Sequence, residues 1–317
     1  MKLSIVIPVY NEGEGVHAAC EGIRSAILSA LPDCVLEMIF VDDGSRDDSF
    51  EHLQALAACH ADVRVIKLLT NVGAHMAIRA GMEAATGDYA CFTACDLQDP
   101  PSAIPAMLEK CVGNVQVVWA VRKSRAEGVL TQAFANIYHA LAHAVVSRNL
   151  PPGGSSMMLV GAKALRALKS NPERNLTIDG FFATAGFRMD TLAVERQERT
   201  RGTSKWTLGK KIKLIVDVFT AYSYVPIRAM SAMGVVLALL GLLYAAVIAL
   251  RYVFMGVSVP GWTSLMVVIL LVGGVQITML GVLGEYVWRG LDEARRRPRY
   301  IVDESIGFDA GDGGAKD

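Results

Sequence analysis

The chain has 317 residues, of which 52% are hydrophobic and 20% charged, and its 31 basic residues balance 31 acidic ones. This composition excludes an intrinsically disordered chain, which would combine low apolar content with a large net charge. The zero net charge argues against nucleic acid as a partner bound through bulk positive charge, and the length suggests one large domain with an addition, or two domains.

Five short apolar runs in the first 120 residues predict β-strands. They are rich in β-branched residues and almost continuously apolar, as expected for strands with both faces covered. The stretches between them have helical spacing, and this alternation indicates βαβ units and a parallel sheet. The predicted strands are Leu3–Ile7, Val35–Val41, Val63–Leu68, Tyr89–Thr93 and Val115–Ala120, and the predicted helices span 14–30, 47–59, 73–85 and 102–112.

Polar residues follow each of these strands. Ligands of an open parallel sheet bind beyond the carboxyl ends of its strands, so chemistry is expected in these loops. Five polar loops at one edge indicate a site more strongly than any single loop does. The loops contain, in chain order, Pro8, Tyr10, Asn11 and Glu12; Asp42 and Asp43; Asn71; Asp96, Gln98 and Asp99; and Arg122 and Arg125.

Acidic residues in two of these loops have patterns with a recognisable chemistry. Asp42–Ser45 (DDGS) can hydrogen-bond a base or ribose while its glycine lets the backbone approach, although the same sequence also suits a turn or a helix cap. Asp96 and Gln98, on an expected strand extension, point the same way and offer oxygen ligands to a divalent cation that bridges a diphosphate. A capping turn before the next helix is the alternative.

Cations in predicted loops could hold phosphates, and arginine could do so with bidentate geometry. Each of them alone is explained more simply as a surface charge. They are Arg122, Arg125, Arg199 and Lys205.

Residues 128–225 carry weaker patterns. Helices are predicted at 129–147 and 162–170 and a strand near 191–195, with a break at Pro151–Gly154. From Leu208 to Tyr224, apolar positions fall on one helical face and lysines mostly on the other. This pattern is typical of a helix on a membrane surface, and an amphipathic helix packed on the domain is the alternative.

Two apolar runs without charges, Ala229–Leu250 and Thr263–Gly284, predict helices that span a membrane, since about 22 residues cross a hydrocarbon core. A buried pair of core helices is the alternative, but such helices normally carry a polar stripe. Basic residues flank the two runs, whereas the connecting loop holds only Arg251, which places both ends in the cytosol. The tail after Asp303 is rich in Gly and Asp and is expected to be disordered.

Several segments together resemble the glycosyltransferases of family 2. They are IVIPVYNE (Ile5–Glu12), VDDGS (Val41–Ser45), NVGAHMAIRAGMEAATGD (Asn71–Asp88) and DLQDPP (Asp96–Pro101). With VVWAVRKSR (Val117–Arg125), ERTRGTSKWTLGKKIK (Glu198–Lys213) and the two spans, the chain is similar to polyprenyl-phosphate glycosyltransferases, the group that contains dolichol-phosphate mannose synthase and its bacterial relatives. The resemblance covers roughly residues 1–300.

The resemblance implies an α/β fold of GT-A type, with a Rossmann-like, mostly parallel sheet, an interfacial helix and a two-helix transmembrane hairpin. The expected parts are a cytosolic catalytic domain (1–207), a juxtamembrane helix (208–225), the hairpin (226–288) and a basic, then disordered, tail (289–317). An integral membrane protein is expected, in the inner membrane if bacterial. Small residues would suit a homo-oligomer through the second span, at Gly273, Gly274, Thr278 and Gly281.

The implied reaction is a metal-dependent, inverting transfer of a sugar from a UDP- or GDP-linked donor to undecaprenyl or dolichyl phosphate, for modification of cell-envelope glycans. The resemblance assigns nucleotide-sugar binding to Pro8, Tyr10, Asn11, Glu12, Asp42, Asp43 and Asn71, and Mg²⁺ or Mn²⁺ binding to Asp96 and Gln98. Asp96, Arg122 and Arg125 would be catalytic, and Arg199, Ser204 and Lys205 would bind phosphate and acceptor.

Two positions depart from the family pattern. Ala94 stands where relatives carry the first acid of the metal motif, and Ser156 stands where many have an acid proposed as catalytic. The chemistry can tolerate this loss because a lipid phosphate is already ionised near pH 7 and needs no strong base to remove a proton. Positioning of two anions and neutralisation of the leaving diphosphate are what the reaction needs.

Three other functions remain as alternatives. A processive polysaccharide synthase would have more spans and a Gln-x-x-Arg-Trp motif, which the sequence lacks. A catalytically silent membrane scaffold that binds nucleotide or lipid is kept open by Ala94 and Ser156. A lipid-sugar flippase would need a pathway that two spans without internal charges do not offer.

Overall fold

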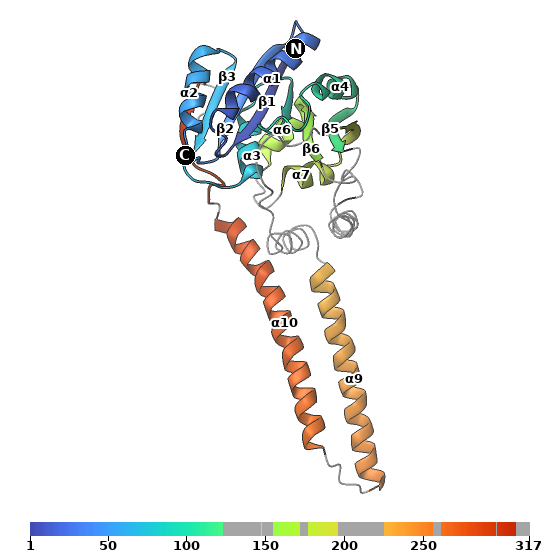
Figure 1. Ribbon diagram of the computed structural model, residues 1–317. Helices are drawn as coiled ribbons and strands as arrows, with labels where there is room; N and C mark the ends of the chain where they lie inside the picture. The colour runs from blue at the N-terminus through green and yellow to red at the C-terminus, as the bar shows by residue number, and fades with distance from the viewer. Residues whose placement is uncertain are drawn as a thin grey trace. The chain divides into compact units, whose positions relative to one another are not determined.

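The computed structural model describes residues 1–122, 147, 155–171, 177–195, 225–255, 261–295 and 297–308. The chain divides into two compact units, of which one comprises Met1–Trp206 with Pro298–Asp317 and the other comprises Thr207–Arg297 (Figure 1). Three sequence expectations lie outside the described residues: most of the helix at 129–147, the break at Pro151–Gly154 and the amphipathic helix at Leu208–Tyr224.

Within the described residues, one eight-stranded sheet with the order β7-β5-β6-β4-β1-β2-β3-β8 forms the centre of the first unit. Pairing is parallel for β1–β2, β1–β4, β2–β3 and β5–β7, and antiparallel for β4–β6, β5–β6 and β3–β8. The strands are β1 (Lys2–Val9), β2 (Val35–Asp42), β3 (Val63–Leu68), β4 (Tyr89–Phe92), β5 (Val115–Arg122), β6 (Ser155–Gly161), β7 (Arg188–Val194) and β8 (Val302–Ile306).

The strand directions confirm the expected common edge. Because β6 runs antiparallel to both β4 and β5, those two strands point the same way. The carboxyl ends of β1 to β5 therefore share one edge of the sheet. Strands β6 and β8 were not predicted, and they make the sheet mixed, although parallel pairs still outnumber antiparallel ones.

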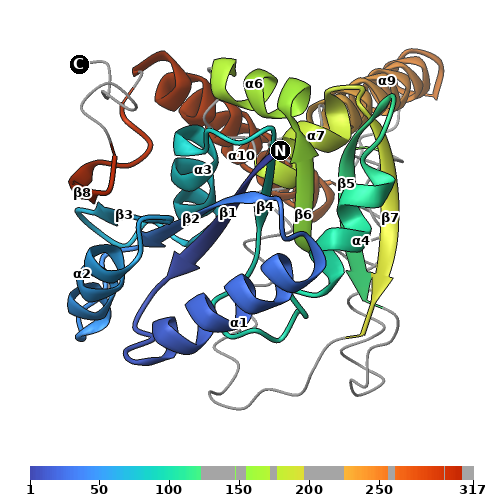
Figure 2. The ribbon, with the colours of Figure 1, turned by 90° about the horizontal axis from the view of Figure 1, so that it is seen from above.

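Helices cover both faces of the sheet, as the almost wholly apolar strands require (Figure 2). One face is covered by α1 (Gly15–Ala30), α2 (Ser49–Cys59) and α4 (Ala103–Lys110). The other face is covered by α3 (Ala74–Ala84), α6 (Ala162–Ser170) and α7 (Ile178–Thr184). The predicted helices at 14–30, 47–59, 73–85, 102–112 and 162–170 are confirmed within one to two residues at each end.

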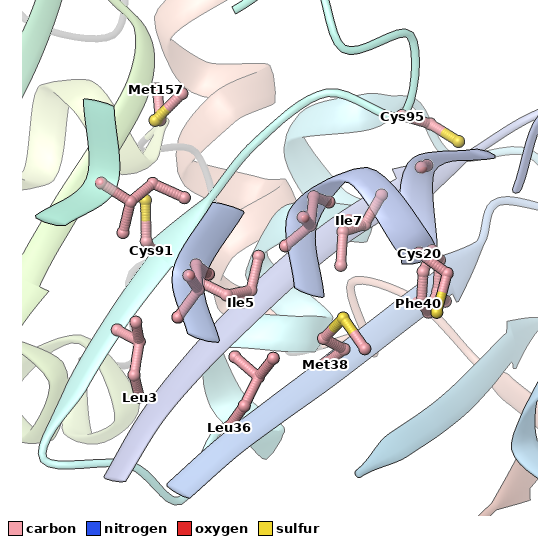
Figure 3. Close-up of a cluster of buried hydrophobic side chains, with 14 of the residues drawn as sticks. Leu3, Ile5, Ile7, Cys20, Leu36, Met38, Phe40, Cys91, Cys95 and Met157 are labelled. Carbon is pink, nitrogen blue, oxygen red and sulfur yellow. The ribbon is translucent and has the colours of Figure 1, made fainter. Parts of the chain in front are cut away.

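Alternation along the strands builds the two cores. Leu3, Ile5 and Ile7 of β1 face the α1 side, and Figure 3 shows them beside Met38 and Phe40 of β2. Val6 of β1 and Ile39 and Val41 of β2 belong to the core under α3. Each fully buried aliphatic side chain contributes ~1.5–3 kcal/mol relative to leaving it in water.

Glu37 of β2 is buried at the amino-terminal side of the sheet and is fully paired. Its carboxylate accepts hydrogen bonds from Ser4 Oγ, from Thr86 N at 2.9 Å and from Thr86 Oγ1 at 2.6 Å. It also forms ion pairs of 3.0 Å with Lys2 Nζ and with Arg64 Nη1. Burial alone would raise the pKa of Glu37, but the hydrogen bonds from Ser4, Thr86 and Lys2 outweigh it and hold that pKa below its ordinary value.

The chain returns to the sheet after the second long helix. Strand β8 pairs antiparallel with β3, and Leu69 N donates to Ile301 O at 2.9 Å. The expectation of disorder after Asp303 is therefore wrong for residues 304–306, because a short strand with little apolar content finds its partner in the free edge of β3. The first unit accordingly includes these residues in addition to the expected 1–207.

A polar network fixes this returning segment, residues 298–308, to α3. Glu83 accepts a 2.7 Å hydrogen bond from Tyr300 OH and pairs with Arg299 Nη1 at 3.5 Å. Glu83 also pairs at 2.8 Å with Nε of Arg79, whose side chain is fully buried. Arg79 Nη2 in turn donates to Asn171 O at 2.9 Å. The segment after the second long helix is thus tied to the helix that begins beside the Asn71 loop.

The second unit contains two long helices, α9 (Val225–Met255) and α10 (Trp262–Arg295). Both are long and apolar enough to cross a membrane, and they contain the expected spans 229–250 and 263–284. A methyl group added at Gly234 of α9 would lie 3.2 Å from Met279 Cε of α10, so the two helices approach closely there. Large apolar side chains along both helices are exposed, for example Leu242 and Ile277.

Candidate active site

Asp43, at the end of β2, organises the loop that follows β3. Its carboxylate accepts hydrogen bonds from Val72 N at 2.8 Å, Gly73 N at 2.9 Å and Asn71 Nδ2 at 3.0 Å. Burial raises the pKa of Asp43, while the bonds from Val72 and Gly73 lower it. Both carboxylate oxygens are therefore used within the protein, and Asp43 shapes the loop rather than offering a vacant acceptor.

Gly44 allows this loop to approach the end of β2. Its φ of +67° is in the left-handed region, and a Cβ built there would lie 2.8 Å from Asn71 N. Any side chain would therefore collide with backbone and strain its own conformation. The glycine of the DDGS motif serves a close approach of two loops of the protein itself.

Asp42, one residue earlier, differs from Asp43. Its Oδ1 accepts from Ser45 N at 3.1 Å, but among the described residues no group donates to its buried Oδ2. Burial is the main cause that raises the pKa of Asp42 above its ordinary value, against the opposing effect of Ser45. A buried acceptor without a donor is costly, so Oδ2 is suited to a donor from a ligand.

The loop after β1 is held in place by the DDGS turn and the start of α2. Asn11, with a φ of 54°, donates its N–H to Ser45 Oγ at 3.0 Å and accepts from Arg46 N through Oδ1 at 2.9 Å. Ser49 Oγ accepts from Glu12 N at 2.9 Å. The Asn11 side chain thus has a partner, whereas Tyr10 is 37% exposed at the same edge. Pro8 lies in β1 itself.

The loop after β4 turns sharply instead of extending the strand. Strand β4 ends at Phe92, and Leu97 has a φ of 52°, so the expected strand extension through Asp96 and Gln98 is wrong. Asp96 Oδ1 accepts from Gln98 N at 3.1 Å, which closes the turn, and Leu97 packs on α1 against Gly22. Asp96 is exposed, whereas Gln98 is buried and its Oε1 lacks a donor among the described residues.

The loops after β1 and β4 leave neighbouring parallel strands, since Val6 pairs with Phe92 and Thr93 N donates to Val6 O at 3.0 Å. Burial is the largest cause that raises the pKa of the Cys95 thiol, and the negative charges of Glu12 and Asp96 raise it further. Two acids from separate loops therefore act on one buried thiol. The edge predicted from the sequence is a real assembly of loops.

The oxygen donors at this edge fit a hard divalent cation. Among the described residues, no group of three or more His, Cys, Asp or Glu side chains could hold a metal ion. An exposed carboxylate at Asp96 and an amide oxygen without a donor at Gln98 nevertheless form the type of incomplete oxygen set that Mg²⁺ completes with water and a substrate diphosphate.

Of the cations expected at the site, the structure describes Arg122. Arg122 is the last residue of β5 and so lies at the same edge. Arg125, Arg199, Ser204 and Lys205 lie outside the described residues. Thr93 and Asp99 were missed as site residues, although both flank the acid–amide pair; each has a buried oxygen without a donor among the described residues.

Loops gathered at the carboxyl edge of a mostly parallel α/β sheet, with buried acceptors that lack donors among the described residues, are typical of an α/β protein of GT-A type. Residues 4–169 match the model of glycosyl transferase family 2, and the chain belongs to this family. The protein is a glycosyltransferase.

Relatives match over nearly the whole chain. An uncharacterized glycosyltransferase of Synechocystis is 33% identical over 312 residues, which are 98% of this chain and 97% of that protein. A prophage bactoprenol glucosyl transferase homolog of Escherichia coli is 32% identical over 303 residues, or 95% and 98% of the two chains. Glucosyl-3-phosphoglycerate synthase from Mycobacterium tuberculosis, a solved structure, is 17% identical with a TM-score of 0.48 and covers 70% of this chain and 78% of its own.

Proposed function

We propose that the enzyme transfers a sugar from a UDP- or GDP-linked donor to a polyprenyl phosphate at the cytosolic face of a membrane. The observation that carries this proposal is that the loops after β1, β2 and β4 leave neighbouring strands at one edge of the sheet and contain buried acceptors without donors among the described residues, in a chain that also has two helices able to cross a membrane. The prophage bactoprenol glucosyl transferase homolog named above supports the lipid acceptor, because it matches this chain over 95% of its length, which includes both long helices.

The donor nucleotide would bind beside β1 and β2. Asp42 Oδ2 would accept a hydrogen bond from the base or ribose, and Tyr10 is exposed beside it to contact the base. Asp43 and Asn71 would act indirectly, by fixing the loop from 71 to 73. Pro8, Asn11 and Glu12 would set the position of the loop that follows β1.

Asp96 and Gln98 would hold Mg²⁺ or Mn²⁺, which when bound neutralises charge on the leaving nucleoside diphosphate. Arg122 and Arg125 would bind the donor diphosphate, and Arg199, Ser204 and Lys205 would orient the acceptor phosphate. The acceptor oxygen carries negative charge near pH 7, so it attacks the anomeric carbon without a strong base at Ser156. In-line displacement then inverts the anomeric configuration.

The membrane arrangement follows from the two long helices. With α9 and α10 as spans, and basic residues flanking both, residues 1–207 and the returning segment would lie in the cytosol. The amphipathic stretch at 208–225 would lie on the membrane surface, where it could bind lipid. The donor would thus come from water and the acceptor from the bilayer.

Membranes that contain the protein, incubated with undecaprenyl phosphate and a panel of radiolabelled nucleotide sugars, test the proposal. We expect label in the organic extract for one donor, loss of that label with a chelator, and loss with Asp96→Ala. Equal label from the wild type and Asp96→Ala would favour a binding scaffold. A product with retained anomeric configuration would refute the in-line displacement.

A further inference from the structure

Three side chains in the loop that leaves β4 have buried oxygens for which the described residues provide no donor. They are Thr93, Gln98 and Asp99, whose side chains are 0%, 3% and 2% exposed. The atoms concerned are Thr93 Oγ1, Gln98 Oε1 and Asp99 Oδ1. All three are oxygens, and they occur within seven consecutive residues.

Asp99 has the greatest need of a partner among the three, because burying a carboxylate without a hydrogen bond or an opposite charge costs more free energy than burying a hydroxyl or an amide. Among the described residues, nothing hydrogen-bonds to its carboxylate or forms an ion pair with it. The buried acids Glu37 and Asp43 show what the fold provides elsewhere, since each of them accepts three hydrogen bonds. Helix α4 does not explain Asp99 either, because Ser102 occupies its N-cap position.

The local geometry keeps Asp99 near Asp96. Three residues of extended chain separate two Cα atoms by about 11 Å at most. The bond from Gln98 N to Asp96 Oδ1 closes a turn, so the Cα atoms of Asp96 and Asp99 lie closer together than this limit. Leu97 anchors the turn against Gly22 of α1. Ala94, between Thr93 and this turn, offers no side-chain ligand.

We propose that Asp99 is a second carboxylate of the cation site, acting with Asp96 and Gln98, and that Thr93 Oγ1 adds a neutral oxygen. This proposal rests on the proposed function, and it names one further ligand for the same site. Carboxylate, amide and hydroxyl oxygens are the ligands that a hard divalent cation prefers, and the set has neither nitrogen nor sulfur. A second negative charge also balances a divalent ion better than Asp96 alone.

Mn²⁺ binding to the full-length protein in detergent tests the assignment, with Mn²⁺ alone and with Mn²⁺ plus UDP or GDP. The free-ion signal in electron paramagnetic resonance gives the affinity, and thermal unfolding with and without Mn²⁺ gives a second readout. Asp99→Asn keeps the size and a hydrogen-bond acceptor but removes the charge, and Asp99→Glu keeps the charge. Asp33→Asn, at an exposed turn, is the matched control.

We expect Asp99→Asn to weaken Mn²⁺ binding at least tenfold, as Asp96→Asn should, whereas Asp99→Glu retains part of the affinity and Asp33→Asn all of it. Without metal, Asp99→Asn should melt at a higher temperature than the wild type, because it removes a buried charge that lacks a partner. A purely structural role of Asp99 would instead lower that melting temperature.

Three results would overturn the proposal. If Asp99→Asn binds Mn²⁺ like the wild type while Asp96→Asn does not, Asp99 is not a ligand, although the proposed function stands. If Asp99→Asn is less stable than the wild type without metal, Asp99 is paired with a group of the protein itself and not with a cation. Absence of Mn²⁺ binding by the wild type, with and without nucleotide, would remove the cation site and the metal dependence of the proposed function together.

Discussion

Substitution by asparagine should have different effects on protein stability at the adjacent acids Asp42 and Asp43. Asp43→Asn should destabilise the protein, because the carboxylate accepts from Val72 N, Gly73 N and Asn71 Nδ2. Asp42→Asn should leave the stability unchanged or raise it, because its Oδ2 has no donor among the described residues to lose. The nucleotide affinity should fall in both variants, for different reasons.

The size of each effect follows from the hydrogen bonds. Asparagine at 43 keeps one acceptor, which can still serve Asn71 and Gly73, and turns an amide donor toward Val72 N, so one charge-assisted bond of ~1.5–3 kcal/mol is lost and a buried donor is left unpaired at a cost of ~1–3 kcal/mol. Relief of the buried charge offsets part of this, which leaves a loss of about 2–4 kcal/mol. At 42, loss of one charged acceptor for a ligand donor corresponds to roughly 10- to 150-fold weaker binding.

Thermal unfolding of the full-length variants in detergent measures the first effect, and calorimetric titration with UDP or GDP measures the second. Because burial raises the pKa of Asp42, its contribution to the metal- and nucleotide-free protein is most favourable below about pH 4 and declines as the pH rises above that value. Asp42→Asn should remove this decline. A wild-type stability for Asp43→Asn, or a large loss of stability for Asp42→Asn, would show that the two roles are assigned wrongly.

Three further substitutions test other parts of the fold. Glu37→Gln should lower the free energy of unfolding by about 2–3 kcal/mol, because it breaks two ion pairs whose cationic partners are partly solvated. The pKa of Glu37 is lowered in the folded protein, so thermal melts should show the higher stability of the wild type above about pH 4.3 and its loss in acid below that value. Gly44→Ala should cost at least ~2 kcal/mol and weaken UDP or GDP binding, as seen by calorimetry, because its Cβ would meet Asn71 N. Tyr300→Phe should lower the unfolding free energy by about 1 kcal/mol in denaturant titrations through the lost bond to Glu83, and an unchanged value would contradict a role in fastening the returning segment.

Periodicity identified the parts of the fold whose sequence pattern is set by burial. The five strands with continuous apolar runs and the helices between them were predicted nearly to the residue, because both faces of each central strand are covered. Strands β6 and β8 escaped prediction for different reasons. Strand β6 follows a Pro-Gly-rich break, and β8 (VDESI) is an exposed edge strand whose acids look like those of a solvated tail.

The site was predictable at the level of loops but not of individual side chains. The sequence places Asp42 and Asp43 together and cannot show that one supports a neighbouring loop while the other retains a vacant oxygen. That difference depends on how closely residues 71–73 approach, which is a tertiary contact between segments almost thirty residues apart. The turn at Leu97 was missed for a related reason, since a leucine rarely adopts positive φ unless packing, here against Gly22, holds it.

Strand β8 has a consequence for biosynthesis. Its partner β3 leaves the ribosome more than two hundred residues earlier, and both long helices are synthesised in between. The nascent catalytic sheet must therefore wait with one edge open until the hairpin has been made, and an open edge is a site where chains aggregate. Genes that end before codon 302 should give a truncated protein that is synthesised in normal amounts yet accumulates in inclusion bodies.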